Sequence, residues 1–299
     1  MRTACTGSAA ALLARCRYPP PGSALTCAVS GGPDSTALLV LATAAQCRVS
    51  AIHVDHGLRP GSAGEAGLVA DACRRFGAAF RSERAEVDPG PNLEARARAA
   101  RASVLPFDAA TGHTADDQAE TVLVNLVRGA ALDGLAGMRP GPRHPILALR
   151  RSETHALCAE LALETVQDPS NADAAHVRNR LRHEALPLLS AIARRDVVPV
   201  LARQAEVLRE EAELLDELCA GLDPTDARAL AAAPPALARR AIRRWLRQDG
   251  ACPPHPPDRD AVQRVLAVAR GQARACEIGA DVRVRRSGGR LLIERTGGH

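Results

Sequence analysis

A glycine-rich segment near the N-terminus carries the residue types that anion binding requires. It follows an apolar stretch over residues 25–29 and consists of Ser30, Gly31, Gly32, Pro33, Asp34, Ser35 and Thr36. Adjacent glycines let a backbone turn tightly and approach a ligand closely, and proline suits the first turn of a helix. Backbone N–H groups at such a helix start, together with the serine and threonine hydroxyls, bind anions. We therefore predict a phosphate-binding loop over residues 30–36.

Asp34 is the exceptional member of this loop. A carboxylate is repelled by a neighbouring phosphate unless a Mg²⁺ ion bridges the two groups. The pattern therefore predicts Mg²⁺ between Asp34 and a bound phosphate. Two glycines alone fit a turn that only begins a helix equally well, but the apolar stretch, the hydroxyls and the aspartate together favour the phosphate site.

A histidine and three carboxylates form a second polar group. Asp116 and Glu120 are four residues apart and share one face of a predicted helix, while Asp117 lies on the next face with Thr121. A carboxylate beside a histidine at a strand-to-helix junction can bind Mg²⁺, hold an ammonium group or accept a proton from an attacking amine. Simpler interpretations stay open, because His113 fits a helix cap and Asp116 fits a solvated first-turn acid.

Arginine supplies every basic side chain, because the sequence contains no lysine. This excludes a Walker A lysine, a Schiff-base lysine and a lysine nucleophile. Arg178 and Arg182 are four residues apart and can present one face to a polyanion. Arg239, Arg243 and Arg247, with Arg240 and Arg244 beside them, form a second basic face that fits nucleic-acid phosphates. Both sets also fit ordinary solvated helix faces, and the formal charge of +5 permits a polyanionic partner without requiring one.

Alternating strands and helices position the polar groups of the first part of the chain. Strands are predicted over residues 25–29, 49–54, 79–84 and 107–111, and helices over residues 36–45, 65–75, 92–105 and 115–127. This alternation predicts an α/β fold with a parallel sheet that helices cover on both faces. Ligands of such sheets bind beyond the carboxyl ends of the strands. We expect the segments that follow the strands to converge there, namely residues 30–36, 55–59 and 112–117.

The pattern changes after about residue 187. Three longer helices are predicted over residues 196–222, 236–248 and 259–270, and the sequence around Ser287, Gly288 and Gly289 predicts a β-hairpin over residues 282–293. We therefore predict a first domain over residues 1–188 and a smaller, mainly helical domain that ends in the hairpin over residues 189–299.

The composition is typical of a globular protein. The 299 residues are 46% hydrophobic and 24% charged. No apolar run reaches the roughly 18–20 residues of a membrane span, and the N-terminus lacks a signal-peptide core, so we expect a cytoplasmic protein without a membrane partner. The nine cysteines form no CxxC pair, which argues against a disulfide framework, a zinc ribbon and a thiol-ligated cluster.

The glycine-rich loop resembles that of the ATP pyrophosphatase (PP-loop) superfamily, whose members cleave ATP to AMP and pyrophosphate. Further stretches are similar to the tRNA(Ile)-lysidine synthase family and occur in order over about the first 190 residues. They are residues 53–59 (HVDHGLR), 92–98 (NLEARAR), 112–121 (GHTADDQAET), 168–171 (DPSN) and 178–182 (RNRLR).

The resemblance implies a Rossmann-like domain of the adenine nucleotide alpha hydrolase type and a definite reaction. In that family ATP adenylates C2 of the wobble cytidine of an isoleucine tRNA with a CAU anticodon, and free L-lysine displaces AMP to give lysidine. The implied cosubstrate is ATP with Mg²⁺. Residues 1–188 would then be the catalytic domain and residues 189–299 the tRNA-binding domain, in a chain that is compatible with a homodimer.

The resemblance also implies roles for individual residues. Catalytic roles fall on Asp34, His113, Asp117, Arg178 and Arg182. ATP contacts are implied for residues 30–36, His53 and Asp55. Contacts with lysine or cytidine are implied for Asp116, Glu120 and Arg98.

Three positions depart from the family pattern. Thr114 stands where a second histidine is common, Ala102 where a tyrosine is common, and His144 where arginine is expected. The sequence ends without the additional C-terminal domain of longer members, so we expect the short form of the family.

Two other functions fit parts of this pattern. Another PP-loop tRNA-modifying enzyme, such as a thiolase, generally needs a paired catalytic cysteine or a CxxC cluster motif, and the cysteine spacing provides neither. A non-catalytic ATP-binding module would need the loop but not the carboxylates after Gly112 or the arginine pair.

Overall fold

The computed structural model describes residues 7–55, 62–85, 93–166, 177–249, 257–279 and 281–295. The chain divides into two compact units, Met1–Leu208 and Arg209–His299, and each unit is described by itself. The domain boundary predicted at residue 188 lies within the first unit. It stays a prediction about where the catalytic residues end and the tRNA-binding residues begin.

The first unit is built on a four-stranded parallel sheet with the order β3-β2-β1-β4. Cys27 of the central strand pairs with Ala51 on one side and Ala110 on the other. Parallel pairing brings the carboxyl ends of all four strands to one edge of the sheet. The predicted α/β fold is therefore confirmed, with strands β1 (Ala24–Ala28), β2 (Arg48–Asp55), β3 (Ala79–Arg84) and β4 (Ala110–Thr111).

Strand β4 is much shorter than the predicted strand over residues 107–111. Ala109 N donates to Pro106 O at 3.0 Å, which closes a turn before the strand begins. Phe107 lies outside the sheet with 86% of its surface exposed, and the guanidinium of Arg143 stacks 4.5 Å from its ring centroid. The apolar residue that favoured a longer strand therefore does not enter the core.

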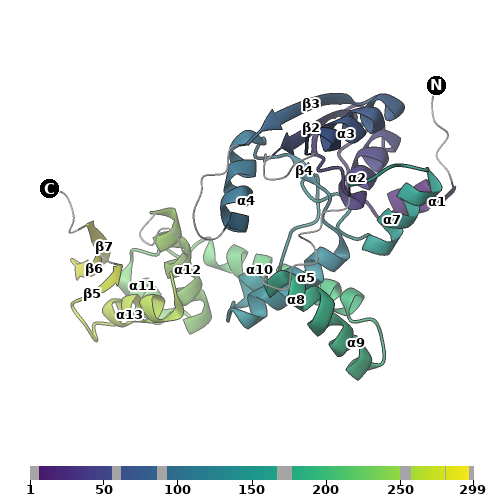
Figure 1. Cartoon of the computed structure of the whole chain (residues 1–299). Helices are drawn as coiled ribbons and strands as arrows, with labels where there is room; N and C mark the ends of the chain where they lie inside the picture. The colour runs from purple at the N-terminus through teal and green to yellow at the C-terminus, as the bar shows by residue number, and fades with distance from the viewer. Residues whose placement is uncertain are drawn as a thin grey trace. The chain divides into compact units, whose positions relative to one another are not determined.

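Helices alternate with the strands of the first unit, and some of them pack on the sheet (Figure 1). They are α1 (Gly7–Leu13), α2 (Pro33–Ala44), α3 (Ser62–Phe76), α4 (Leu93–Val104), α5 (Ala115–Val127), α6 (Leu132–Leu135) and α7 (Arg151–Glu160). Helix α2 packs against α1, α3 and α7 as well as β1 and β2, and its residues 35–42 are all buried. Such a helix has no polar face, which explains its continuous apolar sequence.

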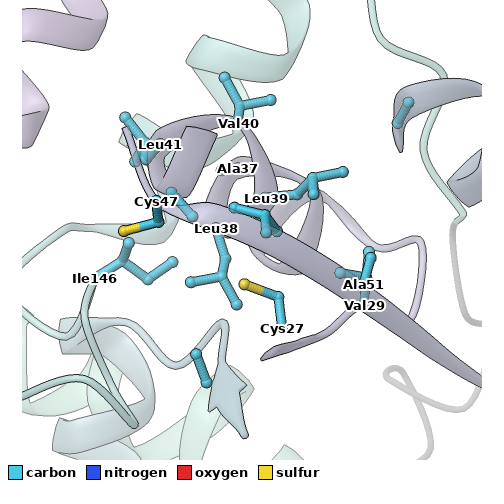
Figure 2. Packing of buried hydrophobic residues seen from close by; sticks show 14 of the residues in the cluster. Cys27, Val29, Ala37, Leu38, Leu39, Val40, Leu41, Cys47, Ala51 and Ile146 are labelled. Carbon is cyan, nitrogen blue, oxygen red and sulfur yellow. The ribbon is translucent and has the colours of Figure 1, made fainter. Parts of the chain in front are cut away.

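The core of this unit contains aliphatic side chains and thiols. Figure 2 shows Leu38 and Leu39 of α2 close to Cys27 of β1, with Ile146 on the same apolar cluster. Burial raises the pKa of the Cys27 thiol to about 12, so it behaves as a small apolar side chain. The cysteines of the described residues are free, as expected from their spacing.

A helical segment that the sequence did not predict carries the arginine pair. It consists of α8 (Val177–Arg180), a π-helical turn η2 (Leu181–Ala185) and α9 (Leu186–Ala193). The π-helical turn lies directly before Pro187, which has no N–H for the helical hydrogen-bond pattern. Leu186 at the start of α9 packs with Ala119 and Leu123 of α5, which brings this segment to the carboxylate-bearing helix.

The second unit combines helices with an antiparallel sheet of order β5-β6-β7. Helix α10 (Val198–Cys219) contains the division between the units, and α11 (Ala227–Ala232), α12 (Pro235–Gln248) and α13 (Arg259–Ala269) follow it. Ile242, Leu246, Val262 and Leu266 form its core with strand residues such as Val284. The strands are β5 (Ala275–Gly279), β6 (Val282–Ser287) and β7 (Arg290–Arg295).

The predicted hairpin is confirmed as β6 and β7. Gly288 and Gly289 both have positive φ, at 54° and 78°, which a two-residue hairpin turn of this kind requires. Strand β5 was not predicted. No helix within the described ranges is long and apolar enough to cross a membrane.

Candidate active site

The phosphate-binding loop joins β1 to α2 at the carboxyl edge of the sheet. Gly32 precedes the helix and Pro33 occupies its first turn. The N–H groups of Asp34 and Ser35 belong to the first turn, where an α-helix provides no internal acceptor. The Ser35 hydroxyl lies 3.2 Å from that of Ser30 and donates to Gly32 O at 2.9 Å. The loop therefore directs backbone donors and two hydroxyls to one place, as anion binding requires.

Thr36 takes a different position from the two serines. Its side chain is buried, and its hydroxyl donates to Gly31 O at 3.4 Å. Its N–H donates to Gly32 O at 3.0 Å, which is the first hydrogen bond of the helix. Thr36 thus stabilises the loop from inside.

Two glycines are needed by the backbone geometry around this loop. Gly31 has a φ of 88°, and a Cβ at this position would lie 2.8 Å from Val166 Cγ2. A Cβ on Gly112, after β4, would lie 2.8 Å from both Asp34 O and Ser35 N. Because the latter two are backbone atoms of the loop, they cannot give way cheaply. Gly112 therefore lets the end of β4 press directly against the phosphate-binding loop.

Asp34 points from α2 toward α7. The Thr154 hydroxyl donates to its Oδ1, and Arg151 Nε lies 3.4 Å from its Oδ2. Burial raises the pKa of Asp34 above its ordinary value, against the lowering effects of Thr154 and Arg151. Thr154 and Arg151 thus hold the carboxylate in place, but they offset only part of the cost of burying its negative charge.

Asp117 has two sets of partners. At the start of α5, its Oδ2 accepts hydrogen bonds from both the N–H and the hydroxyl of Thr114, each at 2.9 Å. Its Oδ1 lies 2.9 Å from Arg151 and 3.5 Å from Arg178. Burial alone would raise the pKa of Asp117, but Arg151, the Thr114 N–H, His113 and Arg178 together lower it. Asp117 therefore stays ionised, and Thr114, where the family often has histidine, keeps a donor beside it.

Glu120 lies at the centre of three arginines. Its side chain is fully buried, at 0% exposure. Its Oε1 lies 2.6 Å from Arg182 Nε and 3.2 Å from Arg151, and its Oε2 lies 2.8 Å from Arg178 Nε. Arg178 and Arg182 therefore share one face, and that face contacts Glu120 of α5. We call Asp117, Glu120, Arg151, Arg178 and Arg182 the ion cluster.

Asp116 does not face the ion cluster with Glu120, although the two are four residues apart. Its carboxylate accepts two hydrogen bonds from the Arg150 guanidinium, both at 3.0 Å, and one from Arg151 N at 2.8 Å. Burial would raise the pKa of Asp116, but these donors lower it. Asp116 thus connects α5 to the start of α7.

His113 follows Gly112 and lies against Thr111 and His144. Its Nδ1 is 2.7 Å from the Thr111 hydroxyl, and His144 Nδ1 is 2.9 Å from the same oxygen. Burial, followed by His113 and Arg143, lowers the pKa of His144 to about 4. His144 is therefore neutral at pH 7.

His53 lies on β2 beside β1 and is 2% exposed. Its Nδ1 is 3.0 Å from Val29 O. A carbonyl oxygen only accepts, so the proton is on Nδ1 and Nε2 carries a lone pair. This buried Nε2 has no hydrogen-bond partner in the part of the chain that the structure describes. Asp55 ends the same strand, and its carbonyl accepts from Ala85 N at 2.9 Å.

Some predicted residues lie outside the described parts. Arg98 belongs to α4, but its side chain is outside the described residues. The same holds for residues 56–59 and for residues 168–171 of the family-like stretches. Within the described ranges, no group of three or more histidine, cysteine and acidic residues is placed to hold a metal ion.

The structure adds four polar residues that sequence analysis did not select. Arg151 and Thr154 belong to α7, Arg150 directly precedes that helix, and Thr111 ends β4. In the structure Arg151 contacts Asp34, Asp117 and Glu120. The apolar pattern of α7 does not indicate these contacts, because they depend on how α7 lies relative to α2 and α5.

The basic face of the second unit is narrower than the sequence indicates. Arg240 Nε lies 2.7 Å from Asp216 Oδ1, and Arg244 donates to Cys219 O at 3.3 Å, so both connect α12 to α10. Among the described residues, no ion pair involves the remaining three arginines. These are Arg239, Arg243 and Arg247, which we call the α12 arginine face.

Comparison with known proteins assigns both parts of the chain. A PP-loop domain matches residues 7–189, and a TilS substrate binding domain matches residues 226–292. The tRNA(Ile)-lysidine synthase of Nocardia farcinica is 40% identical over 297 residues, covering 92% of this chain and 93% of the relative. The chain belongs to the tRNA(Ile)-lysidine synthase family.

Other members of the tRNA(Ile)-lysidine synthase family are equally similar. The Mycobacterium leprae synthase is 42% identical over 296 residues, covering 91% of this chain and 88% of the relative. Among solved structures, the U34-tRNA thiolase NcsA from Methanococcus maripaludis, with its [4Fe-4S] cluster, has a TM-score of 0.51 at 16% identity. It covers 68% of this chain and 78% of the thiolase chain, and at this identity it shows a shared fold only.

Proposed function

We propose that this chain ligates free L-lysine to C2 of the wobble cytidine of an isoleucine tRNA with a CAU anticodon. The C2 oxygen attacks the α-phosphorus of ATP, and pyrophosphate leaves. The lysine amine then forms a bond to C2, and AMP leaves with the former C2 oxygen. Family membership over nine-tenths of the chain supports this reaction.

The observation that carries the proposal is the contact between the two polar groups. Gly112 packs against the loop backbone at Asp34 and Ser35, so the group that follows β4 lies next to the group that grips phosphate. A reaction that adenylates a base and then adds an amine needs both groups at one centre. A protein that only bound ATP would need the first alone.

ATP binding is supported by the loop donors and by His53. The pyrophosphate part fits the N–H groups of the first turn of α2. The buried Nε2 of His53 can accept a hydrogen bond, and a nucleoside hydroxyl or amino group would donate it. We propose Asp55, at the end of the same strand, as a further nucleoside contact.

The magnesium ion fits Asp34 together with the phosphates. Mg²⁺ binds proteins through one or two carboxylates and completes its coordination with phosphate oxygens and water. Asp34 is a single carboxylate beside the phosphate-binding loop, with 24% of its side chain exposed. Bound there, Mg²⁺ would neutralise phosphate charge.

The amine-transfer part is proposed for the residues that follow β4. A lysine ammonium must lose a proton before its nitrogen attacks, so a base is required. We propose His113 as that base and Asp117 as the carboxylate that orients the amine. Glu120, Asp116 and Arg98 are proposed as further contacts of lysine or cytidine, and Arg178 and Arg182 as groups that stabilise the charge of the leaving phosphate.

The second domain is proposed to bind tRNA, with residues 1–188 as the catalytic domain and residues 189–299 as the binding domain. Its support is the TilS substrate binding domain match and the α12 arginine face. A cytoplasmic location is proposed from the sequence, and a homodimer from the family resemblance. Light scattering of the purified protein tests the latter.

The deciding experiment incubates the purified protein with ATP, Mg²⁺, L-lysine and the isoleucine tRNA. We expect mass analysis of the digested tRNA to show one lysine adduct on cytidine, dependent on ATP. A methionine tRNA with the same anticodon triplet serves as the negative control. Sulfur incorporation would instead indicate a thiolase, and ATP binding without tRNA-stimulated pyrophosphate release would indicate a binding module.

A further inference from the structure

One hydroxyl group bridges two histidines at the end of β4. Thr111 Oγ1 lies 2.7 Å from His113 Nδ1, 2.9 Å from His144 Nδ1 and 3.2 Å from Arg143 O. The two imidazole rings meet edge to face, with centroids 5.1 Å apart and planes at 77°. The function proposed above uses His113 alone and gives no role to Thr111 or His144.

Backbone hydrogen bonds fix this group to the sheet. Thr111 N donates to Arg143 O at 2.9 Å, and His144 N donates to Gly141 O at 2.9 Å. These bonds tie the turn that carries His144 to the last residue of β4. Because Gly112 also packs against the phosphate-binding loop, the position of His113 is defined by the strand on one side and the loop on the other.

The proton count of this group determines the tautomer of His113. A threonine hydroxyl has one proton to donate and two lone pairs that accept. The Arg143 carbonyl can only accept, so the hydroxyl proton must point to it if all three contacts are hydrogen bonds. Both lone pairs then accept from N–H groups, which puts a proton on Nδ1 of each histidine. In this arrangement His113 Nε2 is left with a lone pair.

We propose that Thr111 and His144 are positioning residues that keep the His113 proton on Nδ1, so that Nε2 carries the lone pair that the base of the amine-transfer step uses. The inference rests on the function proposed above. In the step, the proton of the lysine ammonium passes to His113 Nε2, the neutral nitrogen then forms a bond to C2, and the second nitrogen proton leaves to water. The bond between C2 and the adenylated oxygen breaks, and AMP takes that electron pair.

The charges around the two rings are compatible with this role. Asp117, on α5, interacts with His113, and a carboxylate nearby favours the imidazolium that the step creates. His144 stays neutral because burial, His113 and Arg143 all lower its pKa, to about 4. A neutral His144 does not oppose the gain of a proton by its neighbour.

The first test reads the tautomer directly. Nitrogen NMR of protein labelled with ¹⁵N-histidine distinguishes a protonated from a bare ring nitrogen, and a His113→Gln sample assigns the His113 signals. We expect the proton on Nδ1 in the wild-type protein and a mixture of tautomers in Thr111→Val. A wild-type His113 with its proton on Nε2 would overturn the proposal. This measurement needs no turnover, so it is separate from any failure of the proposed function.

The second test compares matched variants in single-turnover assays. Thr111→Val removes the hydroxyl at nearly constant volume, and Thr111→Ser restores it. His144→Leu removes the polar contact, and His144→Asn keeps a polar atom close to the position of Nδ1. We expect Thr111→Val and His144→Leu to slow lysine transfer about 10- to 100-fold, below the full contribution of a general base, and the serine and asparagine variants to recover most of the loss.

Pyrophosphate release in the adenylation step is the internal reference. We expect it to change less than about threefold in all four variants, because the loop that binds phosphate is intact. Equal lysine transfer by Thr111→Val and Thr111→Ser would overturn the proposal, as would a loss of adenylation as large as that of transfer. If the wild-type protein adds no lysine to tRNA, the proposed function fails, whatever the tautomer of His113.

Discussion

The arginines of the two units are used in opposite ways. In the first unit, Arg151, Arg178 and Arg182 all contact the buried carboxylate of Glu120. In the second unit, the three arginines of the α12 arginine face form no ion pair with any described residue. One set is compensated inside the protein, and the other leaves its charge available to a partner.

The difference matters because distance and solvent decide what a charge can do. A buried, compensated cluster acts over a few ångströms, holds geometry, and is screened little by salt. An exposed, uncompensated face acts on a polyanion through phosphate contacts, and its effect falls as salt rises. The comparison therefore separates chemistry, which we assign to the first unit, from tRNA affinity, which we assign to the second.

The largest effect is expected at Asp34, the carboxylate beside the loop. Asp34→Asn should abolish AMP formation, because the amide cannot hold Mg²⁺ at the phosphates. The pKa of Asp34 is raised in the folded protein, so its ionised form costs stability at neutral pH. We therefore expect an unchanged or higher melting temperature. Turnover near the wild-type rate would show that the loop assignment is wrong.

Asp117 tests whether the ion cluster serves chemistry rather than nucleotide binding. Asp117→Ala should slow lysidine formation by about 10²–10⁴, the range of positioning and proton transfer, and change ATP affinity much less. Asp117→Asn is the control, since it keeps an acceptor for the Thr114 N–H and loses only the charge. Equilibrium ATP binding and single-turnover lysine incorporation are measured on one preparation. An equal loss of both in Asp117→Ala would make Asp117 a nucleotide or metal ligand.

Substitution of Glu120 tests how much stability its buried negative charge gives by pairing with three arginines. Glu120→Gln leaves three guanidinium groups without their shared buried counter-charge, so we expect a loss of about 3–5 kcal/mol in the free energy of unfolding. Urea unfolding followed by circular dichroism measures it. Glu184→Gln is the matched control, because Glu184 pairs with Arg180 on the exposed surface, and we expect almost no change there. Similar effects of the two substitutions would contradict the distinction between buried and exposed pairs.

Much of this arrangement could be predicted from sequence where local signals coincide. The loop over residues 30–36 combines an apolar strand, two glycines and a proline at the helix start, and each of these acts over a few residues. Helix α5 also begins and ends as predicted, at Ala115 and Val127. Strand β5 lacked such a signal because it is short, and its register shifts between Glu277 and Gly279.

Helix α7 was not predicted, because its start depends in part on a distant residue. Arg150 precedes its first residue, Arg151, and basic residues are unfavourable at a helix N-terminus. Glu153 in the first turn accepts from Arg150 N at 2.7 Å. The structure compensates with Asp116, which accepts from Arg151 N and pairs with Arg150. The spacing of four residues predicted that Asp116 and Glu120 share one helix face. In the structure they have different partners, because Asp116 contacts the start of α7 and Glu120 contacts the arginines of the ion cluster.

The α12 arginine face should control tRNA affinity without touching the chemical step. Replacing Arg243 and Arg247 by alanine should weaken binding of all tRNAs and reduce the slope of log affinity against log salt by about two units, one for each lost contact. Filter binding at several salt concentrations measures the slope. Replacing Arg259, at the start of α13, and Arg270, directly after its end, removes the same charge from the same unit and serves as the control. Reduced affinity with an unchanged slope would place the phosphate contacts elsewhere.

The smallest expected effect is on the pH dependence of stability. It comes from His144, a basic side chain that the fold keeps neutral, unlike the charged arginines of the two units. The pKa of His144 falls from 6.5 to about 4 on folding, first because of burial. As the pH falls from 6.5 to 4, the unfolded chain binds a proton that the folded chain does not, so stability present above pH 6.5 is lost. We expect a loss of about 1 kcal/mol in the free energy of unfolding, less than an unscreened shift would give, because the ring is partly exposed.

His144→Asn should remove this pH dependence of stability, while His155→Asn, at an exposed position, should keep it. Urea unfolding at pH 4.5 and pH 7 measures the difference, in a range above the depressed pKa values of Asp116 and Asp117. Equal pH dependence of the wild-type protein and His144→Asn would show that folding does not lower the pKa of His144, against the burial of its ring.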